Sequence, residues 1–209
     1  SVQLTVVFPL LEDDPAIGDV PNSAHWRDLI AAHDPEVIDF AQLPFNHPLY
    51  ILYSSGTTGA PKCIVHGAGG TLLQHLKEQQ LHCNVKPGDR AFYFTTCGWM
   101  MWNWLGTFLA SEATVVLYDG SPSYPGPEVL FDYTDAVGIN LFGTSAKFID
   151  ALGNIGLKPM ETHQLSSLHT ILSTGSPLVP EGFDYIYENI KKDVCLSSIA
   201  GGTDIVGCF

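Results

Sequence analysis

Small and hydroxyl-bearing residues dominate "SSGTTGAPK", which runs from Ser54 to Lys62. Glycine leaves backbone N–H groups accessible to a ligand, and serine and threonine add hydroxyl donors. Successive backbone amides can form a concavity that binds an anion, and Lys62 would add a positive charge. The segment therefore indicates a site for a ligand with many acceptor oxygens, such as a chain of phosphates.

Two common phosphate-binding loops do not fit this spacing. A Walker A loop needs a glycine at the sixth position and a hydroxyl residue after its lysine. Counted from Gly56, the sixth position is Pro61, and Lys62 is followed by Cys63. A Rossmann G-x-G-x-x-G also fails, because Gly56 and Gly59 are three positions apart and nothing completes the pattern. A glycine-rich hairpin or loop without a ligand remains an alternative, although ordering so many glycines is costly for a plain connector.

Short apolar runs alternate with amphipathic ones along the rest of the chain. We expect strands over residues 3–8, 50–54, 90–96, 113–120, 139–144, 168–174 and 194–199. We expect helices over residues 26–32, 71–81, 100–111, 128–138, 145–153 and 180–192. Repeated strand–helix–strand units predict an α/β fold, with a mostly parallel sheet covered by helices.

The expected helices differ in character. The helix over 71–81 places Leu72, Leu73 and Leu76 on one face. The helix over 100–111 is apolar nearly all round, which predicts that it is buried. Ser145 is placed to cap the helix over 145–153, and Pro180 begins the last helix. The strand over 50–54, which is also apolar, is expected to be buried.

Ligands of parallel α/β sheets bind at the carboxyl ends of the strands. The loops that follow the expected strands are all rich in glycine, serine and threonine. They cover residues 54–62, 95–99, 143–146, 173–177 and 200–204. We expect them to form a polar floor for a ligand along one edge of the sheet.

Composition excludes several classes of function. A net charge of −13 with only nine Lys and Arg argues against nucleic-acid binding, but one nucleotide could still be held by backbone amides and a metal ion. The five cysteines are odd in number and form no C-x-x-C pair, so zinc is not predicted. Scattered free thiols are typical of a reducing compartment, so we expect a cytoplasmic protein. No apolar run is long enough to span a bilayer.

Three motifs carry a resemblance to a known superfamily. "SSGTTGAPK" matches every position of [ST]-[ST]-G-[ST]-T-G-x-P-K, the signature of the adenylate-forming enzymes, which include acyl-CoA synthetases and luciferases. "STGSP", residues 173–177, resembles their adenine-binding loop, and "GGTD", residues 201–204, resembles the loop that handles the α-phosphate and magnesium. "IVHGAGG" and "CGWMMW" are similar to the acetyl-CoA synthetase branch, and within it to members that activate acetoacetate.

The resemblance implies a two-step reaction and roles for several residues. ATP would activate acetoacetate, or a related short-chain acid, to an acyl-adenylate, and the acyl group would then pass to coenzyme A. Thr203 would hold the α-phosphate, Lys62 would add a cation, and Asp204 would share Mg²⁺. Because most of the superfamily has glutamate at this position, the shorter aspartate favours coordination through water. The other phosphate contacts would come from Ser54, Ser55, Gly56, Thr57, Thr58 and Gly59.

The resemblance also implies an adenine pocket and an acyl pocket. Gly175, Ser176 and Pro177 would line the first, and the second would be lined by Trp99, Met100, Met101 and Gly201. Acetate-using members carry tryptophan at the position of Gly201, so the glycine would admit a longer acid. Each assignment has an alternative: "STGSP" is also a common turn before a helix, residues 99–101 could be core packing, and Gly201 could serve backbone conformation alone. His66 is the histidine expected to face the site, and a structural role for it is equally open.

The resemblance covers only the middle of such an enzyme. We expect residues 1–48 to be a preceding strand and loop region, and residues 49–209 to be the nucleotide- and acyl-binding core of an N-terminal domain. The smaller C-terminal domain, with its catalytic lysine, is expected to lie outside this chain. The alternatives are an inactive truncated nucleotide-binding domain, an acetyl- or propionyl-type synthetase, and an α/β domain without a ligand. The sequence does not indicate the oligomeric state.

Overall fold

The computed structural model describes residues 2–34, 37–54 and 59–209. The chain divides into two compact units, Ser1–Gln42 and Leu43–Phe209. In the first unit, strand β1 (Thr5–Val7) pairs in parallel with β2 (Ser23–His25), and helix α1 (Trp26–Ala31) follows directly. The strand over 3–8 and the helix over 26–32 are therefore confirmed within a few residues, whereas β2 was not predicted.

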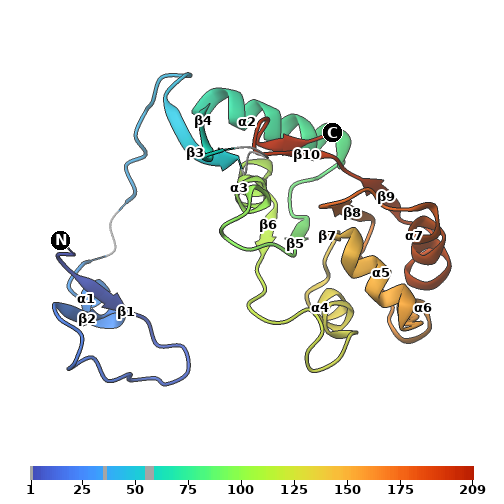
Figure 1. The fold of residues 1–209 in the computed structure, drawn as a ribbon, viewed down its shortest axis with the longest axis horizontal. Helices are drawn as coiled ribbons and strands as arrows, with labels where there is room; N and C mark the ends of the chain where they lie inside the picture. Colours follow the sequence, from blue (N-terminus) through green and yellow to red (C-terminus); the bar gives the residue numbers. More distant parts are fainter. Residues whose placement is uncertain (1, 35–36, 55–58) are drawn as a thin grey trace. The chain divides into compact units, whose positions relative to one another are not determined.

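A five-stranded parallel sheet forms the centre of the second unit (Figure 1). Its strand order is β6-β5-β7-β8-β9, and every neighbouring pair is parallel. The strands are β5 (Arg90–Tyr93), β6 (Thr114–Val116), β7 (Leu141–Ser145), β8 (Thr170–Thr174) and β9 (Cys195–Ser198). This sheet confirms the predicted α/β fold.

Helices cover both faces of the sheet. Phe92, Phe142 and Ile171 are buried in one core cluster on the face covered by α4 (Val129–Val137), α5 (Ala146–Asn154), and α7 (Pro180–Tyr185) with its continuation η3 (Ile186–Ile190). The short α6 (Pro159–Thr162) precedes β8. On the other face, α3 (Met100–Gly106) and η2 (Thr107–Ser111) pack Trp104 and Phe108 into a second cluster. The expectation that the helix over 100–111 is buried holds for the side that carries Met101, Trp104 and Phe108, whereas Leu109 is 67% exposed.

Local signals fix the start of two helices as predicted. The Ser145 hydroxyl accepts a hydrogen bond from the Phe148 backbone N–H at 3.2 Å, which caps α5. Pro180 occupies the first turn of α7, where its missing N–H costs nothing. Among the described residues, no helix is long and apolar enough to cross a membrane.

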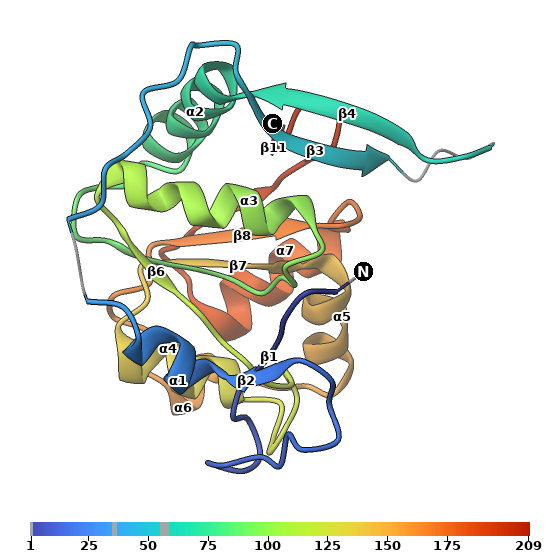
Figure 2. The same ribbon diagram turned by 90° about the vertical axis from the view of Figure 1, so that its left-hand side faces the viewer.

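The structure corrects the expectation that the strand over 50–54 is buried. Strand β3 (Pro48–Ser54) pairs antiparallel with β4 (Lys62–Gly67), apart from the five-stranded sheet (Figure 2). Ile51 and Tyr53 are 59% and 66% exposed. A continuous apolar run is typical of a buried parallel strand, but here a local partner with the matching register satisfies the backbone instead. The β4 strand was not predicted.

A second hairpin follows the sheet. Strands β10 (Gly201–Gly202) and β11 (Gly207–Cys208) pair antiparallel around a turn at residues 203–206. Helix α2 (Ala68–Leu76) continues as the π-helical segment η1 (Lys77–His82) and hydrogen-bonds to this hairpin.

The buried side of α2 and η1 is polar, not leucine-rich. Its fully buried residues are Thr71, His75, Glu78 and Gln79, whereas Leu72 and Leu73 are 42% and 60% exposed. The polar side chains can be buried because each of the three longest has hydrogen-bond partners on α3, η2 or the second hairpin.

Candidate functional site

Four of the five predicted loops meet at one edge of the sheet. They follow β5, β7, β8 and β9, whose carboxyl ends share that edge because the strands are parallel. The fifth follows β3, which pairs with β4 apart from the five-stranded sheet, so the expectation that it follows a strand of that sheet is wrong. Its residues Ser55, Gly56, Thr57 and Thr58 lie outside the described residues. Ser54 pairs with Lys62 across the hairpin, and Gly59 has a φ of 110°, which glycine tolerates.

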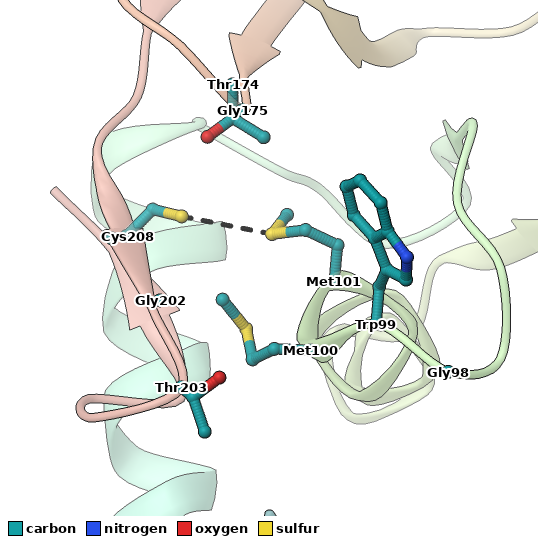
Figure 3. A pocket seen from close by; sticks show the side chains of 10 residues that line it. Gly98, Trp99, Met100, Met101, Thr174, Gly175, Gly202, Thr203 and Cys208 are labelled. Atoms are coloured by element: carbon teal, nitrogen blue, oxygen red, sulfur yellow. Dashed lines mark hydrogen bonds between the residues drawn. The ribbon is translucent and has the colours of Figure 1, made fainter. Parts of the chain in front are cut away.

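A cavity of about 290 Å³, here called the first cavity, opens between α3 and the second hairpin (Figure 3). It brings together all four residues of the predicted acyl pocket and Thr203 of the predicted phosphate loop. Its lining comprises Gly98, Trp99, Met100, Met101, Thr174, Gly175, Gly201, Gly202, Thr203 and Cys208.

A second cavity of about 190 Å³ adjoins the first. Trp99, Met101, Thr174 and Gly175 line both, so a ligand could extend from one into the other. Gly175 and Ser176 of the predicted adenine loop border the second cavity, whereas Pro177 lines neither. The structure therefore brings part of the adenine loop to the acyl residues.

Sulfur atoms dominate the inner wall of the first cavity. Figure 3 shows the side chains of Met100, Met101 and Cys208 turned toward one another, and Cys208 Sγ lies 3.8 Å from Met101 Sδ. Burial raises the pKa of Cys208 to about 11, so it remains a neutral thiol at pH 7. Cys208 was not among the predicted site residues, and only its position four residues after "GGTD" could have indicated it.

Gly201 lines the first cavity through its backbone. A Cβ at this position would lie 2.0 Å from the Gly207 carbonyl oxygen and 2.6 Å from Cys208 Cα. A side chain at position 201 would therefore point at the neighbouring strand. Any residue other than glycine would push the two strands apart. This geometry favours the alternative in which Gly201 serves the backbone.

Two histidines hold the turn that carries Thr203 and Asp204. His66 Nε2 donates to the Thr203 carbonyl oxygen at 2.7 Å, and His75 Nε2 donates to the Val206 carbonyl oxygen. His66 and Asp204 also line a third cavity of about 470 Å³ beside α2. His66 thus lies next to the predicted phosphate and magnesium residues, and its contact there is to the backbone.

His75 is a neutral donor. It is fully buried, and burial lowers its pKa below 6.5 more than its bond to Val206 and the nearby Glu78 raise it. In the neutral ring Nε2–H donates to Val206 and Nδ1 can accept. The Thr107 hydroxyl, which has one hydrogen, lies 2.9 Å from Nδ1 and 3.0 Å from the Asn103 carbonyl oxygen.

Glu78 is a buried carboxylate, only 2% exposed, beside the same hairpin. Its Oε2 accepts from Trp104 Nε1 at 2.8 Å and from the Cys208 backbone N–H at 3.2 Å. Its Oε1 accepts from the Gln74 side-chain amide, with Lys77 Nζ at 3.9 Å. The sequence analysis did not predict this role, although Thr71, His75 and Glu78 follow helical spacing and could have indicated a buried polar face.

The described residues contain no cluster of three His, Cys, Asp or Glu side chains suited to a metal ion. Mg²⁺ bound to a nucleotide needs only one or two carboxylates, because it keeps several waters and binds the phosphates. Asp204 is exposed in the turn next to Thr203, and this position fits such a site.

Comparisons with known proteins identify a family and several relatives of the chain. The family described as "AMP-binding enzyme" matches residues 7–194. The chain is 59% identical over 206 residues to acetoacetyl-coenzyme A synthetase of Rhizobium meliloti, covering 98% of this chain and 32% of the relative. It is 45% identical to a malonamoyl-CoA synthetase of Penicillium aethiopicum, covering all of this chain and 31% of that relative. A solved structure of acetoacetyl-CoA synthetase from Streptomyces lividans superposes with a TM-score of 0.87 at 41% identity, covering 100% of this chain and 32% of that one. The chain thus spans about a third of the length of these relatives.

Proposed function

The chain belongs to the AMP-binding enzyme family, and from that premise we propose that it is the nucleotide- and acyl-binding part of an acetoacetate–CoA ligase. The observation that carries the proposal is the first cavity, which joins a small, largely apolar space to Thr203. The high identity to two acetoacetyl-CoA synthetases supports the same substrate.

The proposed reaction needs little covalent help from the protein. A carboxylate oxygen of acetoacetate attacks the α-phosphorus of ATP and expels pyrophosphate. The thiol of coenzyme A then attacks the acyl carbon and expels AMP. Positioning and charge stabilisation account for most of the rate in reactions of this kind. The first cavity would orient the acid, and Thr203 would hold the α-phosphate beside it.

The other residues have roles in holding the nucleotide. Lys62, with residues 54–59, would contact the departing phosphates. Gly175, Ser176 and Pro177 would line the adenine side. Asp204 would hold Mg²⁺, in part through water, and the ion when bound neutralises phosphate charge. The second cavity, which Gly175 and Ser176 border, would take the adenine side of the nucleotide.

The sulfur-rich wall bears on which acid fits. Acetoacetate and malonamate have the same number of non-hydrogen atoms, and differ by a methyl group in place of an amide NH₂. Thioether and thiol sulfur atoms are weak hydrogen-bond partners. A methyl group packs against them without loss, whereas an amide beside them would find only weak hydrogen-bond partners. The lining of Met100, Met101 and Cys208 therefore favours acetoacetate, with malonamate as the second candidate.

The domain assignment and the location are part of the proposal. Residues 1–48 would lead into the core at 49–209, and a C-terminal domain outside this chain would supply a lysine for the adenylation step. We place the full-length enzyme in the cytoplasm. The isolated 209-residue chain should bind ATP without turning over.

The test uses the full-length enzyme and this chain side by side. Pyrophosphate release is measured with ATP, Mg²⁺ and each of acetoacetate, malonamate, acetate and propionate, and ATP binding to the chain is measured by calorimetry. We expect the full-length enzyme to turn over at about 1–10³ per second with acetoacetate, and the chain to bind ATP without steady release. Release with acetate or propionate at the highest kcat/KM would contradict the substrate assignment, and the absence of ATP binding would contradict the site.

A further inference from the structure

One carboxylate contacts both walls of the first cavity. We propose that Glu78 is a positioning residue that fixes the width of this cavity, and thereby the acid that the enzyme accepts. The inference rests on the proposed function, in which the first cavity holds the acid.

The two walls come from segments far apart in the sequence. Met100 and Met101 belong to α3, and Cys208 belongs to β11. Trp104, one turn beyond the methionines on α3, donates its indole N–H to Glu78 Oε2 at 2.8 Å. The Cys208 backbone N–H donates to the same oxygen at 3.2 Å. A single oxygen atom therefore sets the separation of helix and strand.

The packing around this carboxylate leaves little freedom. A Cβ on Gly207 would lie 2.6 Å from Glu78 Oε1 and 2.7 Å from Oε2, so the carboxylate lies directly against the strand backbone. Trp104 is 1% exposed, and its N–H has Glu78 as its hydrogen-bond partner. The Cys208–Met101 contact of 3.8 Å spans the same gap from inside the cavity.

The chemistry of a carboxylate suits this task better than that of an amide. Both oxygens accept hydrogen bonds, and Oε1 takes the Gln74 amide while Oε2 takes the two wall donors. Glutamine would offer one acceptor oxygen and would direct its NH₂ toward Gln74 or the wall donors. Glu78→Gln should therefore keep some of the hydrogen bonds to Trp104 and Cys208, and Glu78→Ala should keep none of them.

The experiment measures substrate preference in the full-length enzyme. Glu78→Ala, Glu78→Gln and Trp104→Phe are compared with wild type, using acetoacetate, acetate and butyrate. Trp104→Phe keeps an aromatic ring in the core and removes only the N–H donor, so it remains informative if Glu78→Ala does not fold. Glu161→Gln is the matched control, because that carboxylate is exposed on α6 and its ion-pair partner among the described residues is Lys158.

We expect Glu78→Ala and Trp104→Phe to raise the KM for acetoacetate about tenfold and to change the KM for ATP less than threefold. The ratio of kcat/KM for acetoacetate to that for acetate should fall about tenfold, with Glu78→Gln intermediate and Glu161→Gln unchanged. Equal losses for all acids, or a lower melting temperature with an unchanged ratio, would overturn the role of Glu78 alone. Absence of acid-dependent pyrophosphate release by wild type would overturn the proposed function as well.

Discussion

The two hairpins of the second unit both carry residues assigned to the nucleotide, but they are stabilised in different ways. The β3–β4 hairpin has a ladder that runs from Pro48 to Ser54, and its side chains are exposed or half-buried. The β10–β11 hairpin has only two residues in each strand, yet its residues 206–208 are buried. A long hairpin can be stabilised by the many backbone hydrogen bonds between its own strands. A hairpin with two residues in each strand has few such bonds, so it needs contacts with other parts of the chain.

That support comes from polar side chains on β4, α2 and η1. His66, His75 and Glu78 each bond to the backbone of residues 203–208. Charge-assisted or buried hydrogen bonds of this kind are costly to leave unmade. The comparison teaches that the motif residues Thr203 and Asp204 depend on side chains outside any motif, and the following predictions test that dependence.

The largest effect is expected from Gly201→Trp. The new Cβ would approach the Gly207 carbonyl oxygen to 2.0 Å, so the β10–β11 hairpin must separate. We expect a loss of about 3 kcal/mol or more in the free energy of unfolding, and kcat/KM values that fall by similar factors for acetoacetate and acetate. Chemical denaturation and steady-state kinetics provide the measurements.

Tyr53→Trp is the matched control for this substitution. Tyr53 lies on β3 and is 66% exposed, so the larger ring meets solvent. Its change in stability should stay within about 0.5 kcal/mol. A Gly201→Trp variant that is stable and loses only acetoacetate would instead support the interpretation in which the glycine opens the acyl pocket.

Each hairpin carries one cysteine, and the reactivity of its thiol reports how exposed that hairpin is. Cys63 on β4 is exposed, whereas Cys208 on β11 is buried and its pKa is raised to about 11. At pH 8, roughly one Cys208 side chain in a thousand is a thiolate, which is the reactive form. We expect iodoacetamide to label Cys63 at least about 100 times faster, as followed by peptide mass spectrometry. Comparable rates would show that the second hairpin opens readily and would contradict its tight packing.

The sequence predicted the sheet well because its strands and helices follow strong periodicities. The strands at Phe92, Phe142 and Ile171, and the cap at Ser145, were each expected from local pattern. The prediction failed at Ile51 and Tyr53, where an apolar run suggested burial. Pairing with β4 depends on register and tertiary context, which a local pattern does not contain.

The candidate site was predicted where a motif exists, and missed where only packing matters. Trp99, Met101 and Thr203 were named from motifs, and they line one cavity. Cys208 and Glu78 belong to no motif, and their importance follows from contacts across 107 and 130 positions of sequence. Contacts over such separations are set by the fold, so they could not be inferred from neighbouring residues.

Smaller effects are expected from substitutions of the residues assigned to the nucleotide, one on each hairpin, in the full-length enzyme. Lys62→Met on the first hairpin should raise the KM for ATP about tenfold, because a phosphate contact is lost. Asp204→Asn on the second should lower the adenylation rate and raise the magnesium requirement about tenfold, because an amide is a weaker ligand for Mg²⁺ than a carboxylate. Titrations of ATP and of Mg²⁺ distinguish them. Wild-type values for Asp204→Asn in both titrations would contradict the assignment of Asp204.

The smallest effect concerns pH and the single histidine buried under the second hairpin. Because burial lowers the pKa of His75 below 6.5, the unfolded chain binds a proton more readily than the folded one as the pH falls. The contribution of His75 is therefore fully present above about pH 6.5 and is lost below it, at no more than about 1.4 kcal/mol per pH unit. His75→Gln is the matched variant, because its amide can still donate to Val206 without titrating. Urea unfolding of both chains between about pH 7.5 and 5.5 should show a steeper decline for wild type, and equal slopes would mean that His75 is not held neutral by the hairpin.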